Sequence, residues 1–479
     1  MGNRNHYLWS TFNRIGTQSI GFIGNVIIAR QLSPDDYGLI AMLAIIMGIA
    51  WNFTESGFGD CLIRKMDVTK LDYDTIFVYN LVVSLILYSV LYFSAPLIAT
   101  FFERHELIEI TRLLGIAIIL NAITITEFTR MMKELKFKNF ALIQISSSLI
   151  SVVVAYLMAL EGYGYYSLIF QALTFSLVNI FLITVINKWK PFFHFSWERY
   201  RQMKSFSNNM LISYFTNQIG QNLYSVFIGK FQAAVSLGYY NQASKINDAN
   251  FQSINSVILT TSYPLIAKEK DKSIRKSMYH ALLNNFLFIQ YGICFFIIGS
   301  AFPLIQILFG SKWLTTAPYL ILMTIAYLFN PVMTVNANII KTENRSDLYR
   351  NLTFLRNGLS LISLLLTYKY GVEMILIGQI FARYISVIID VFYCGPQIEF
   401  GPIQQLKVIT IQLVGPLSAC ILAYLISKDA GKSIHQIVIF GLVYLFAILL
   451  INKLIKNQIQ IELFKRMRIL CKRSTHLKH

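Results

Sequence analysis

Apolar and polar residues alternate along this chain in long blocks. Fourteen apolar stretches stand between polar connectors, and each is close to the roughly 20 residues that a helix needs to cross a hydrocarbon core of about 30 Å. The stretches are 9–30, 37–58, 73–102, 107–126, 140–160, 163–186, 206–229, 239–266, 279–302, 317–340, 352–370, 372–393, 406–427 and 434–453. The pattern therefore predicts an all-α integral membrane protein with about 14 transmembrane helices.

The positive charges between these stretches predict the topology. With the N-terminus placed in the cytoplasm, the connectors on that side hold 30 of the 42 Lys and Arg residues, the opposite side holds 8, and 4 fall inside helices. Cytoplasmic loops of membrane proteins carry such an excess of Lys and Arg. Because the predicted number of spans is even, both termini are expected to be cytoplasmic.

Composition and charge narrow the class of protein. With 55% apolar residues, 14% charged residues and a mean hydropathy of +0.53, the chain is too apolar for a soluble surface. The net charge of +18 does not indicate nucleic acid, because the basic residues stand in short runs between apolar segments. The predicted outer connectors are short and no catalytic constellation is visible, so we do not expect an enzyme such as a glycan ligase or polymerase.

Motifs for cofactors are missing from the sequence. Gly431-Lys432-Ser433 lacks the upstream glycine of a phosphate-binding loop, so direct ATP hydrolysis is not expected. No CxxC or HExxH spacing occurs, so neither a disulfide framework nor a metal site is indicated. We interpret the five cysteines as packing residues: Cys61, Cys294, Cys394, Cys420 and Cys471.

A weak internal repeat predicts two lobes of six helices. Ile27-Ile28-Ala29-Arg30 leads to Tyr37-Gly38-Leu39, and 200 positions later Phe227-Ile228-Gly229-Lys230 leads to Leu237-Gly238-Tyr239. Parallel repeats with a site between the lobes are a common transporter plan. The predicted parts are an N-terminal lobe, a cytoplasmic amphipathic linker, a C-terminal lobe, two additional helices and a basic cytoplasmic tail, at 1–186, 187–205, 206–393, 394–453 and 454–479.

Several predicted helices carry a stripe of polar residues at helical spacing. In the first helix, Arg14, Gln18 and Asn25 fall within roughly 40° of arc at about 100° per residue. The other stripes lie on predicted helices 2, 7, 8 and 12: Asn52 and Glu55; Asn209, Ser213, Asn217 and Gln221; Asn241, Lys245, Asp248, Gln252 and Asn255; Gln379, Arg383 and Asp390. Ionisable groups inside a membrane usually face a bundle interior or a water-filled cavity.

The stripes have simpler interpretations as well. Neutral Asn, Gln and Ser side chains can bond across a packed helix interface at about 0.6 kcal/mol each. Arg14 lies early enough in its helix to reach the cytoplasmic headgroups instead of a cavity. Lys245 and Asp248, three residues apart, could form a purely structural ion pair.

Three motifs in the first hundred residues resemble a known family. They are Trp9-Ser10 through Arg14-Ile15-Gly16-x-Gln18, the run Ala29-Arg30-Gln31-Leu32-Ser33-Pro34-Asp35-Asp36-Tyr37-Gly38-Leu39-Ile40-Ala41-Met42, and Ser56-Gly57-Phe58-Gly59-Asp60-Cys61-Leu62-Ile63-Arg64-Lys65. These segments are similar to the Wzx and WzxC-type polysaccharide flippases, in the superfamily that also holds the MATE exporters and the lipid II flippase. The similarity is dense over about 1–100 and diffuse beyond, and Cys61 departs from the small residue usual there.

The resemblance implies a carrier in the bacterial cytoplasmic membrane. Its substrate would be an undecaprenyl-pyrophosphate-linked oligosaccharide for O-antigen, capsule or exopolysaccharide assembly, and its partners would be membrane lipids, a polysaccharide polymerase and chain-length machinery. Candidate substrate-binding residues are Arg14, Gln18, Asn25, Asn217, Gln221, Asn241, Lys245, Gln252, Gln379 and Arg383. Candidates for coupling to a proton or sodium gradient are Glu55, Asp248 and Asp390. The alternative is an ion-coupled MATE-like exporter of small amphipathic compounds, which the three embedded carboxylates keep open.

Overall fold

The structure, a computed structural model, describes residues 2–55, 57–190, 192–269, 271–343 and 345–454. Within these ranges it contains helices and connecting loops and no β-strand. The predicted tail therefore lies almost wholly outside the described residues. For some helical positions, 208–217 and 219–221 among them, only the backbone is described.

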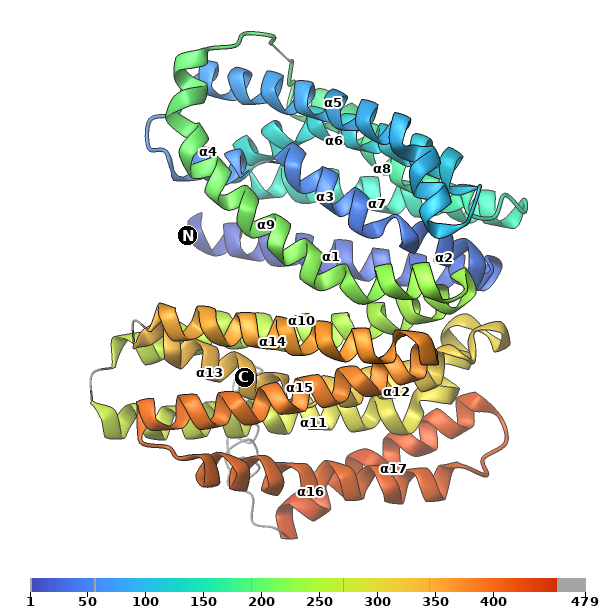
Figure 1. Cartoon of the computed structure of the whole chain (residues 1–479), viewed down its shortest axis with the longest axis vertical. Helices are drawn as coiled ribbons and strands as arrows, with labels where there is room; N and C mark the ends of the chain where they lie inside the picture. Colours follow the sequence, from blue (N-terminus) through green and yellow to red (C-terminus); the bar gives the residue numbers. More distant parts are fainter. Residues whose placement is uncertain (1, 56, 191, 270, 344, 455–479) are drawn as a thin grey trace, which may run out of the picture. The chain divides into compact units, whose positions relative to one another are not determined.

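The chain divides into two compact units, Met1–Asn241 and Gln242–His479, with the division inside α10. The predicted lobe boundaries at 186, 206 and 393 stay a prediction. Figure 1 shows long helices running side by side within each unit. The helices of the first unit are α1 (Gly2–Gln31), α2 (Pro34–Met42), α3 (Ala44–Glu55), α4 (Phe58–Arg64), α5 (Lys70–Phe102), α6 (Leu107–Lys133), α7 (Phe137–Leu160), α8 (Tyr166–Ile186), α9 (Trp197–Phe231) and the start of α10 (Ala234–Lys268).

The second unit continues from α10. Its helices are α11 (Lys272–Phe309), η1 (Ser311–Trp313), α12 (Thr316–Ala326), α13 (Asn330–Thr342), α14 (Ser346–Thr367), η2 (Tyr368–Tyr370), α15 (Val372–Cys394), η3 (Gly395–Ile398), α16 (Pro402–Ser427) and α17 (Ser433–Leu454). Each of the fourteen predicted stretches coincides with one long helix or with a broken pair. The broken pairs are α2 with α3, and α12 with α13.

The chemistry of residues 33–38 explains why α2 begins where it does. Ser33 is the N-cap, and its backbone N–H donates to Asp36 Oδ2 at 2.9 Å while the Asp36 N–H donates to Ser33 Oγ at 3.2 Å. Pro34 occupies the first helical turn, where its missing N–H costs nothing. Residues 33–38, which belong to the second of the three family motifs, therefore form the start of a helix.

The length and hydropathy of each helix decide whether it can span a membrane. Nine helices among the described residues are long and apolar enough to span a membrane, and the bent pair from Pro34 to Arg64 would make ten. The predicted count of fourteen spans is therefore not confirmed. Of the predicted spans that fail this test, those on α1, α9 and α10 carry polar stripes, which lower their hydropathy.

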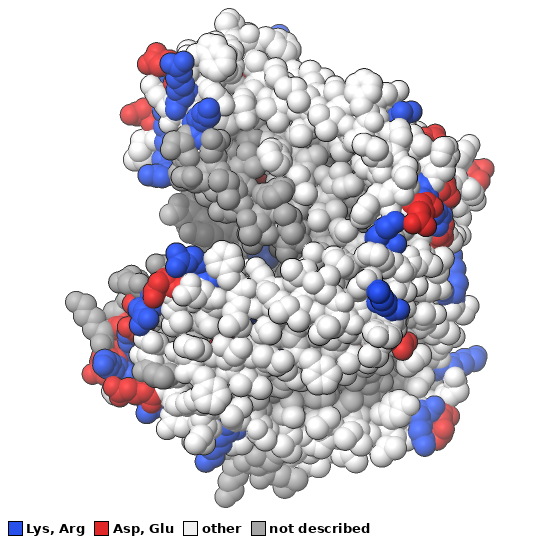
Figure 2. Space-filling view, viewed as in Figure 1, with Lys and Arg blue, Asp and Glu red and all other residues white. Residues whose placement is uncertain are grey.

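The charged side chains mark the helix ends. Figure 2 shows Lys, Arg, Asp and Glu gathered at both ends of the helices, with an almost uncharged surface between them. Large apolar side chains lie exposed on this surface, among them Phe93 at 79% and Phe181 at 63% exposed. Such a band would be unfavourable in water, and it matches a hydrocarbon environment. The protein is a multi-pass membrane protein.

A buried polar junction organises the second unit around α11. The Tyr279 hydroxyl lies 2.6 Å from Asn336 Oδ1 and 2.9 Å from Gln405 Oε1, so α11, α13 and α16 meet at one point. Asn336 Nδ2 also donates to Gln405 Oε1 at 3.4 Å. Tyr279 belongs to an apolar core that α10, α11, α13, α15, α16 and α17 build together. Satisfied polar groups of this kind fix the register between helices.

Candidate functional site

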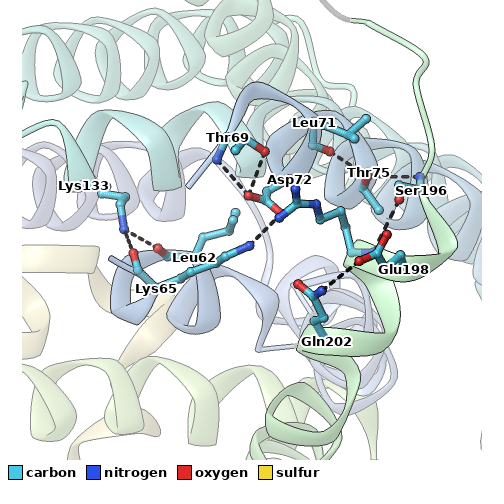
Figure 3. A network of polar contacts seen from close by, with 11 residues as sticks. Leu62, Lys65, Thr69, Leu71, Asp72, Thr75, Lys133, Ser196, Glu198 and Gln202 are labelled. Atoms are coloured by element: carbon cyan, nitrogen blue, oxygen red, sulfur yellow. Dashed lines mark hydrogen bonds and ion pairs between the residues drawn. The ribbon is translucent and has the colours of Figure 1, made fainter. Parts of the chain in front are cut away.

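A buried carboxylate, Asp72, gathers charged and polar groups at the predicted cytoplasmic end of the first unit (Figure 3). Its side chain is fully buried. Lys65 Nζ donates to Asp72 Oδ1 at 2.9 Å, and the Thr69 N–H and hydroxyl donate to Oδ2 at 2.8 and 3.0 Å. Arg199 adds a second positive charge 3.9 Å from Oδ1. The two cations stabilise a charge that burial alone would disfavour.

Lys133, at the end of α6, closes the C-terminus of α4. Its Nζ donates to the carbonyl oxygens of Leu62 at 2.6 Å and Ile63 at 3.2 Å, and also to that of Lys65. The last carbonyls of a helix have no partner within it and carry a partial negative charge. Lys133 therefore satisfies the end of α4, a short helix that lies within the third family motif, Ser56 to Lys65.

The same network reaches α9. The Ser196 N–H donates to Thr75 Oγ1 at 3.2 Å, and the Arg199 N–H donates to Ser196 Oγ, the N-cap of α9, at 3.5 Å. Residues 192–196 of the predicted linker form no helix, and the chain enters α9 at Trp197. Asp72 and Thr75 on α5 thus fix where the long polar helix α9 begins.

The opposite, predicted outer end of the first unit is held by three further ion pairs. Arg104 binds Asp35 with two hydrogen bonds, of 3.0 and 2.7 Å, and also contacts Glu106 at 3.1 Å. Lys230, at the end of α9, donates to Glu103 at 2.8 Å. The hydrogen bond with Asp35 raises the pKa of Arg104, and hydrogen bonds from Lys230 and Arg104 lower the pKa of Glu103 and Glu106 respectively.

In the second unit, Arg383 lies at a break between two helices. The break falls at 327–329, between α12 and α13, where Pro331 follows Asn330 and disfavours continued helix. The Arg383 guanidinium lies 3.6 Å from the centre of the Tyr327 ring and donates to Asn330 Oδ1 at 3.1 Å. Arg383 is half-buried, and Asp248 on α10 is near enough for the two charges to interact.

Other side chains satisfy the carbonyls that this break releases. The Tyr384 hydroxyl donates to the carbonyl of Ile325 at 3.0 Å, and Gln290 Nε2 donates to that of Tyr327 at 3.4 Å. Broken helices are tolerated at membrane depth where neighbouring helices supply such partners. Half-helix ends of this kind form substrate and ion sites in several transporter folds.

Asp390 has a dedicated partner. Arg356 on α14 donates to both carboxylate oxygens at 2.6 and 2.7 Å, and Asp390 is fully buried while Arg356 is 17% exposed. Sequence analysis named Asp390 as a candidate for ion coupling. The structure gives Asp390 a structural role, and its part in ion coupling stays a prediction.

The other predicted residues are placed as follows. Arg14 and Gln18 are exposed on α1, and Asn25 is half-buried, with its carbonyl accepting from the Tyr37 hydroxyl at 3.4 Å. Glu55 is exposed at the end of α3. The side chains of Asn217 and Gln221 lie outside the described residues.

The α10 and α15 candidates differ in environment. Lys245 and Gln252 are exposed on α10, and Asn241 and Asp248 are half-buried. The Ser244 hydroxyl donates to Asp248 Oδ2 at 3.0 Å. Sequence analysis considered Lys245, three residues before Asp248, as the partner of this carboxylate. Gln379 on α15 is buried. The structure thus brings Arg383 and Asp248 into one neighbourhood, and the roles of all these residues in binding stay predictions.

Sequence analysis did not select three residues that anchor the Asp72 network and the helix break beside Arg383. Tyr327 and Asn330 were not selected, because their partner Arg383 lies 53 or more residues away. Asp72 was not selected because it stands in a predicted polar connector, although Lys65 and Thr69 lie close to it in the sequence. Pro331, directly after Asn330, was the available signal for the break. Within the described chain, no group of three or more His, Cys, Asp or Glu side chains could hold a metal ion.

The described residues form a helical, multi-pass membrane protein with charged clusters at the helix ends and a broken helix in its second unit. The model of a family described as polysaccharide biosynthesis protein matches residues 27–318, and the chain belongs to this family.

Relatives agree with that assignment. The chain is 28% identical over 301 residues to the teichuronic acid biosynthesis protein TuaB of Bacillus subtilis, with 61% of this chain and 62% of TuaB covered. It is 24% identical over 319 residues to the succinoglycan biosynthesis transport protein ExoT of Rhizobium meliloti, covering 66% of this chain and 65% of ExoT. The chain thus spans just under two thirds of the length of these two relatives.

The resemblance read from the sequence is confirmed. The lipopolysaccharide biosynthesis protein WzxC of Escherichia coli is 19% identical over 347 residues, covering 71% of this chain and 70% of WzxC. Among solved structures, the lipid II flippase MurJ matches with a TM-score of 0.69 at 17% identity, covering 93% of this chain and 99% of MurJ. A MATE multidrug transporter of the MOP superfamily matches with a TM-score of 0.59 at 14% identity, covering 80% and 94%. At these identities the two structures establish the fold.

Proposed function

We propose that the protein is a flippase that carries undecaprenyl-pyrophosphate-linked oligosaccharide repeat units across the bacterial cytoplasmic membrane by alternating access. The observation that carries the proposal is the family match over residues 27–318. Relatives named for teichuronic acid, succinoglycan and lipopolysaccharide support a glycan substrate. The fold shared with a lipid II flippase supports a lipid-linked one.

The chemistry of the second unit is compatible with such a substrate. A pyrophosphate-linked glycan needs positive charge for its phosphates and neutral polar groups for its sugars. Arg383 offers a guanidinium that is half-buried within a predicted span, and it is oriented by Tyr327 and Asn330 without a direct carboxylate hydrogen bond among those described. Arginine suits bidentate phosphate recognition. Lys245, exposed on α10, would add further positive charge in this unit, and Arg14, exposed on α1 of the first unit, stays a candidate from the sequence.

The proposal also covers the membrane topology of the chain and the ion gradient that drives transport. We place both termini in the cytoplasm and assign Glu55, Asp248 and Asp390 to coupling with a proton or sodium gradient. A polymerase and chain-length machinery would take the product on the outer side. Reporter fusions at His479 and within 428–433 should give opposite compartments, and like signals from both would contradict this topology.

The function is tested by deleting the gene in its host. Surface glycan should fall, and lipid-linked repeat units should accumulate facing the cytoplasm, because only translocation is lost. The wild-type gene should restore surface glycan, and an Arg383→Gln variant made at normal levels should not. Normal surface glycan in a strain without a paralogue would refute the proposal.

The MATE-like alternative has the shared fold in its favour. It predicts efflux of small amphipathic cations, which the basic groups Arg14, Lys245 and Arg383 would repel. Proteoliposomes that export a cationic dye but do not move a lipid-linked oligosaccharide would support this alternative and exclude the flippase.

A further inference from the structure

A polar pocket opens at the predicted cytoplasmic end of the first unit, outside the residues proposed to bind the glycan. Its volume is about 540 Å³, and it lies between the start of α5, the end of α6 and the linker that follows α8. The linker contributes Lys188, Trp189 and Lys190, and α5 contributes Lys70 and Asp74. The pocket therefore combines several charges with aromatic walls.

Most of its acidic groups are already neutralised within the protein. Glu127 is 2% exposed, accepts a hydrogen bond from Asn187 and lies 3.7 Å from Arg130. Glu134 binds Arg130 at 2.8 Å and Lys136 at 2.6 Å. Arg130 is therefore committed to these two carboxylates, and Asp74 is the remaining acidic group of the pocket.

Three lysines line the pocket together with that single carboxylate. Lys70 rests on the Phe192 ring, 3.4 Å from its centre, and its charge interacts with Asp74. Lys188 and Lys190 are exposed, and no ion pair joins either of them to an acidic group in the described part of the chain. Lys188 has a φ of 50°, a left-handed conformation that is uncommon for a non-glycine residue. The linker thus holds Lys188 at the pocket in a backbone conformation that a lysine rarely adopts.

Aromatic residues place the pocket at a membrane surface. Trp189 packs edge-on against Phe77, with ring centres 5.5 Å apart, and Phe193 packs against the same ring at 5.7 Å. Phe193 is 69% exposed and Trp197 is 66% exposed. Exposed aromatics beside lysines are typical of the headgroup layer, and basic pockets on the cytoplasmic side of transmembrane helices bind anionic headgroups.

We propose that this pocket binds the phosphate of an anionic phospholipid of the inner leaflet. Lys188 and Lys190 contact the phosphate, Lys70 balances Asp74, and Trp189 and Phe193 lie against the glycerol and the upper acyl chains. The site is separate from glycan transport and does not depend on the proposed function. A soluble phosphate ester shares the phosphate chemistry but lacks the acyl chains.

Lipid binding to the purified full-length chain tests the proposal. Native mass spectrometry in detergent measures the affinity for phosphatidylglycerol, for phosphatidylcholine and for glycerol phosphate. Phosphatidylglycerol should bind about tenfold or more tightly than phosphatidylcholine, since each lysine near an anionic surface contributes about a factor of five. The double variant Lys188→Gln/Lys190→Gln should lose that preference and keep its weak binding of phosphatidylcholine.

The matched control is Lys138→Gln. Lys138 is an exposed lysine in the first turn of α7 and does not line the pocket, so its replacement removes charge at the same end of the helices. All replaced lysines are exposed, and thermal unfolding should confirm that each variant folds. Equal affinity of the wild type for both lipids, or an equal loss in the control, would overturn the proposal. Glycerol phosphate binding as tightly as phosphatidylglycerol would assign the pocket to a soluble ester instead.

Discussion

Gly38 and Gly238 each lie against the backbone at the start of the other's helix. A Cβ added to Gly38 would fall 1.9 Å from the carbonyl oxygen of Ala234, and one added to Gly238 would fall 1.9 Å from that of Pro34. All four residues belong to the first unit, and the contact has the same 200-residue offset as the sequence repeat. The first turns of α2 and α10 can approach this closely only because neither glycine has a side chain.

Replacing Gly38 with Ala should separate the two helix starts. The clash is with backbone atoms, which cannot rotate away, so we expect the free energy of unfolding to fall by about 1–3 kcal/mol, as for other overpacked sites. Thermal unfolding of the purified protein measures this. Gly21→Ala is the control, because nothing lies within 4 Å of a Cβ there and helix propensity should stabilise it by about 0.5–1 kcal/mol. Equal midpoints for the two variants would show that the close contact does not exist.

Replacing Asp72 with Asn should loosen the junction between α5 and α9. Asn keeps the size of the side chain but removes the charge that Lys65 and Arg199 share. We expect a loss of about 1.5–3 kcal/mol, the range for a hydrogen bond to a charged group. Asp67→Asn, at an exposed position of the same connector, should change stability by no more than about 0.5 kcal/mol. If the two variants unfold alike, the network contributes nothing.

Two replacements of Arg383 test the contributions of its charge and of its planar guanidinium separately. Gln removes both the charge and the stacking on Tyr327, whereas Lys keeps the charge and loses the planar guanidinium. Glycan export should fall at least about tenfold in Arg383→Gln, which corresponds to about 1.4 kcal/mol, and less in Arg383→Lys. Arg14→Gln and Lys245→Gln should also reduce export, and Asn217→Ala should matter less. Normal export in all three Gln variants at normal expression would mean that these residues are structural.

The Arg356–Asp390 pair can be tested with a double-mutant cycle. Asp390→Asn alone leaves Arg356 largely buried without its partner, so we expect a loss of about 3–5 kcal/mol. The double variant Arg356→Gln/Asp390→Asn should recover part of it, which thermal unfolding measures. If the double variant is stable and exports glycan with undiminished dependence on the ion gradient, Asp390 has no role in coupling.

Much of the fold could be predicted because the membrane imposes it. Apolar runs near 20 residues leave little choice but helices, and every predicted stretch is helical. The break at Leu43, between α2 and α3, could not be predicted, since residues 37–58 contain neither proline nor a charged cluster at that point. The sequence shows the repeated glycine at 38 and 238. It does not show that the two helix starts that contain these glycines are in contact.

The candidate site was harder to predict, because ion pairs depend on which helices are neighbours. Helical spacing selected Arg383 and Asp390 as embedded charges. It could not show that Arg356 is the partner of Asp390, 34 residues earlier on a different helix. Asp72 was overlooked because it stands in a polar connector, where an exposed carboxylate is the usual case. Burial, which sequence alone does not give, distinguishes it.

The break between α12 and α13 has a consequence for how fast its amides exchange with solvent deuterium. Tyr384 and Gln290 donate to the carbonyls of Ile325 and Tyr327, and the Leu328 N–H donates to the Ile325 carbonyl at 3.2 Å. Opening the break requires several hydrogen bonds to be lost together. We therefore expect the Leu328 amide to exchange as slowly as those of the flanking helices, and the break to act as a rigid corner of the chain.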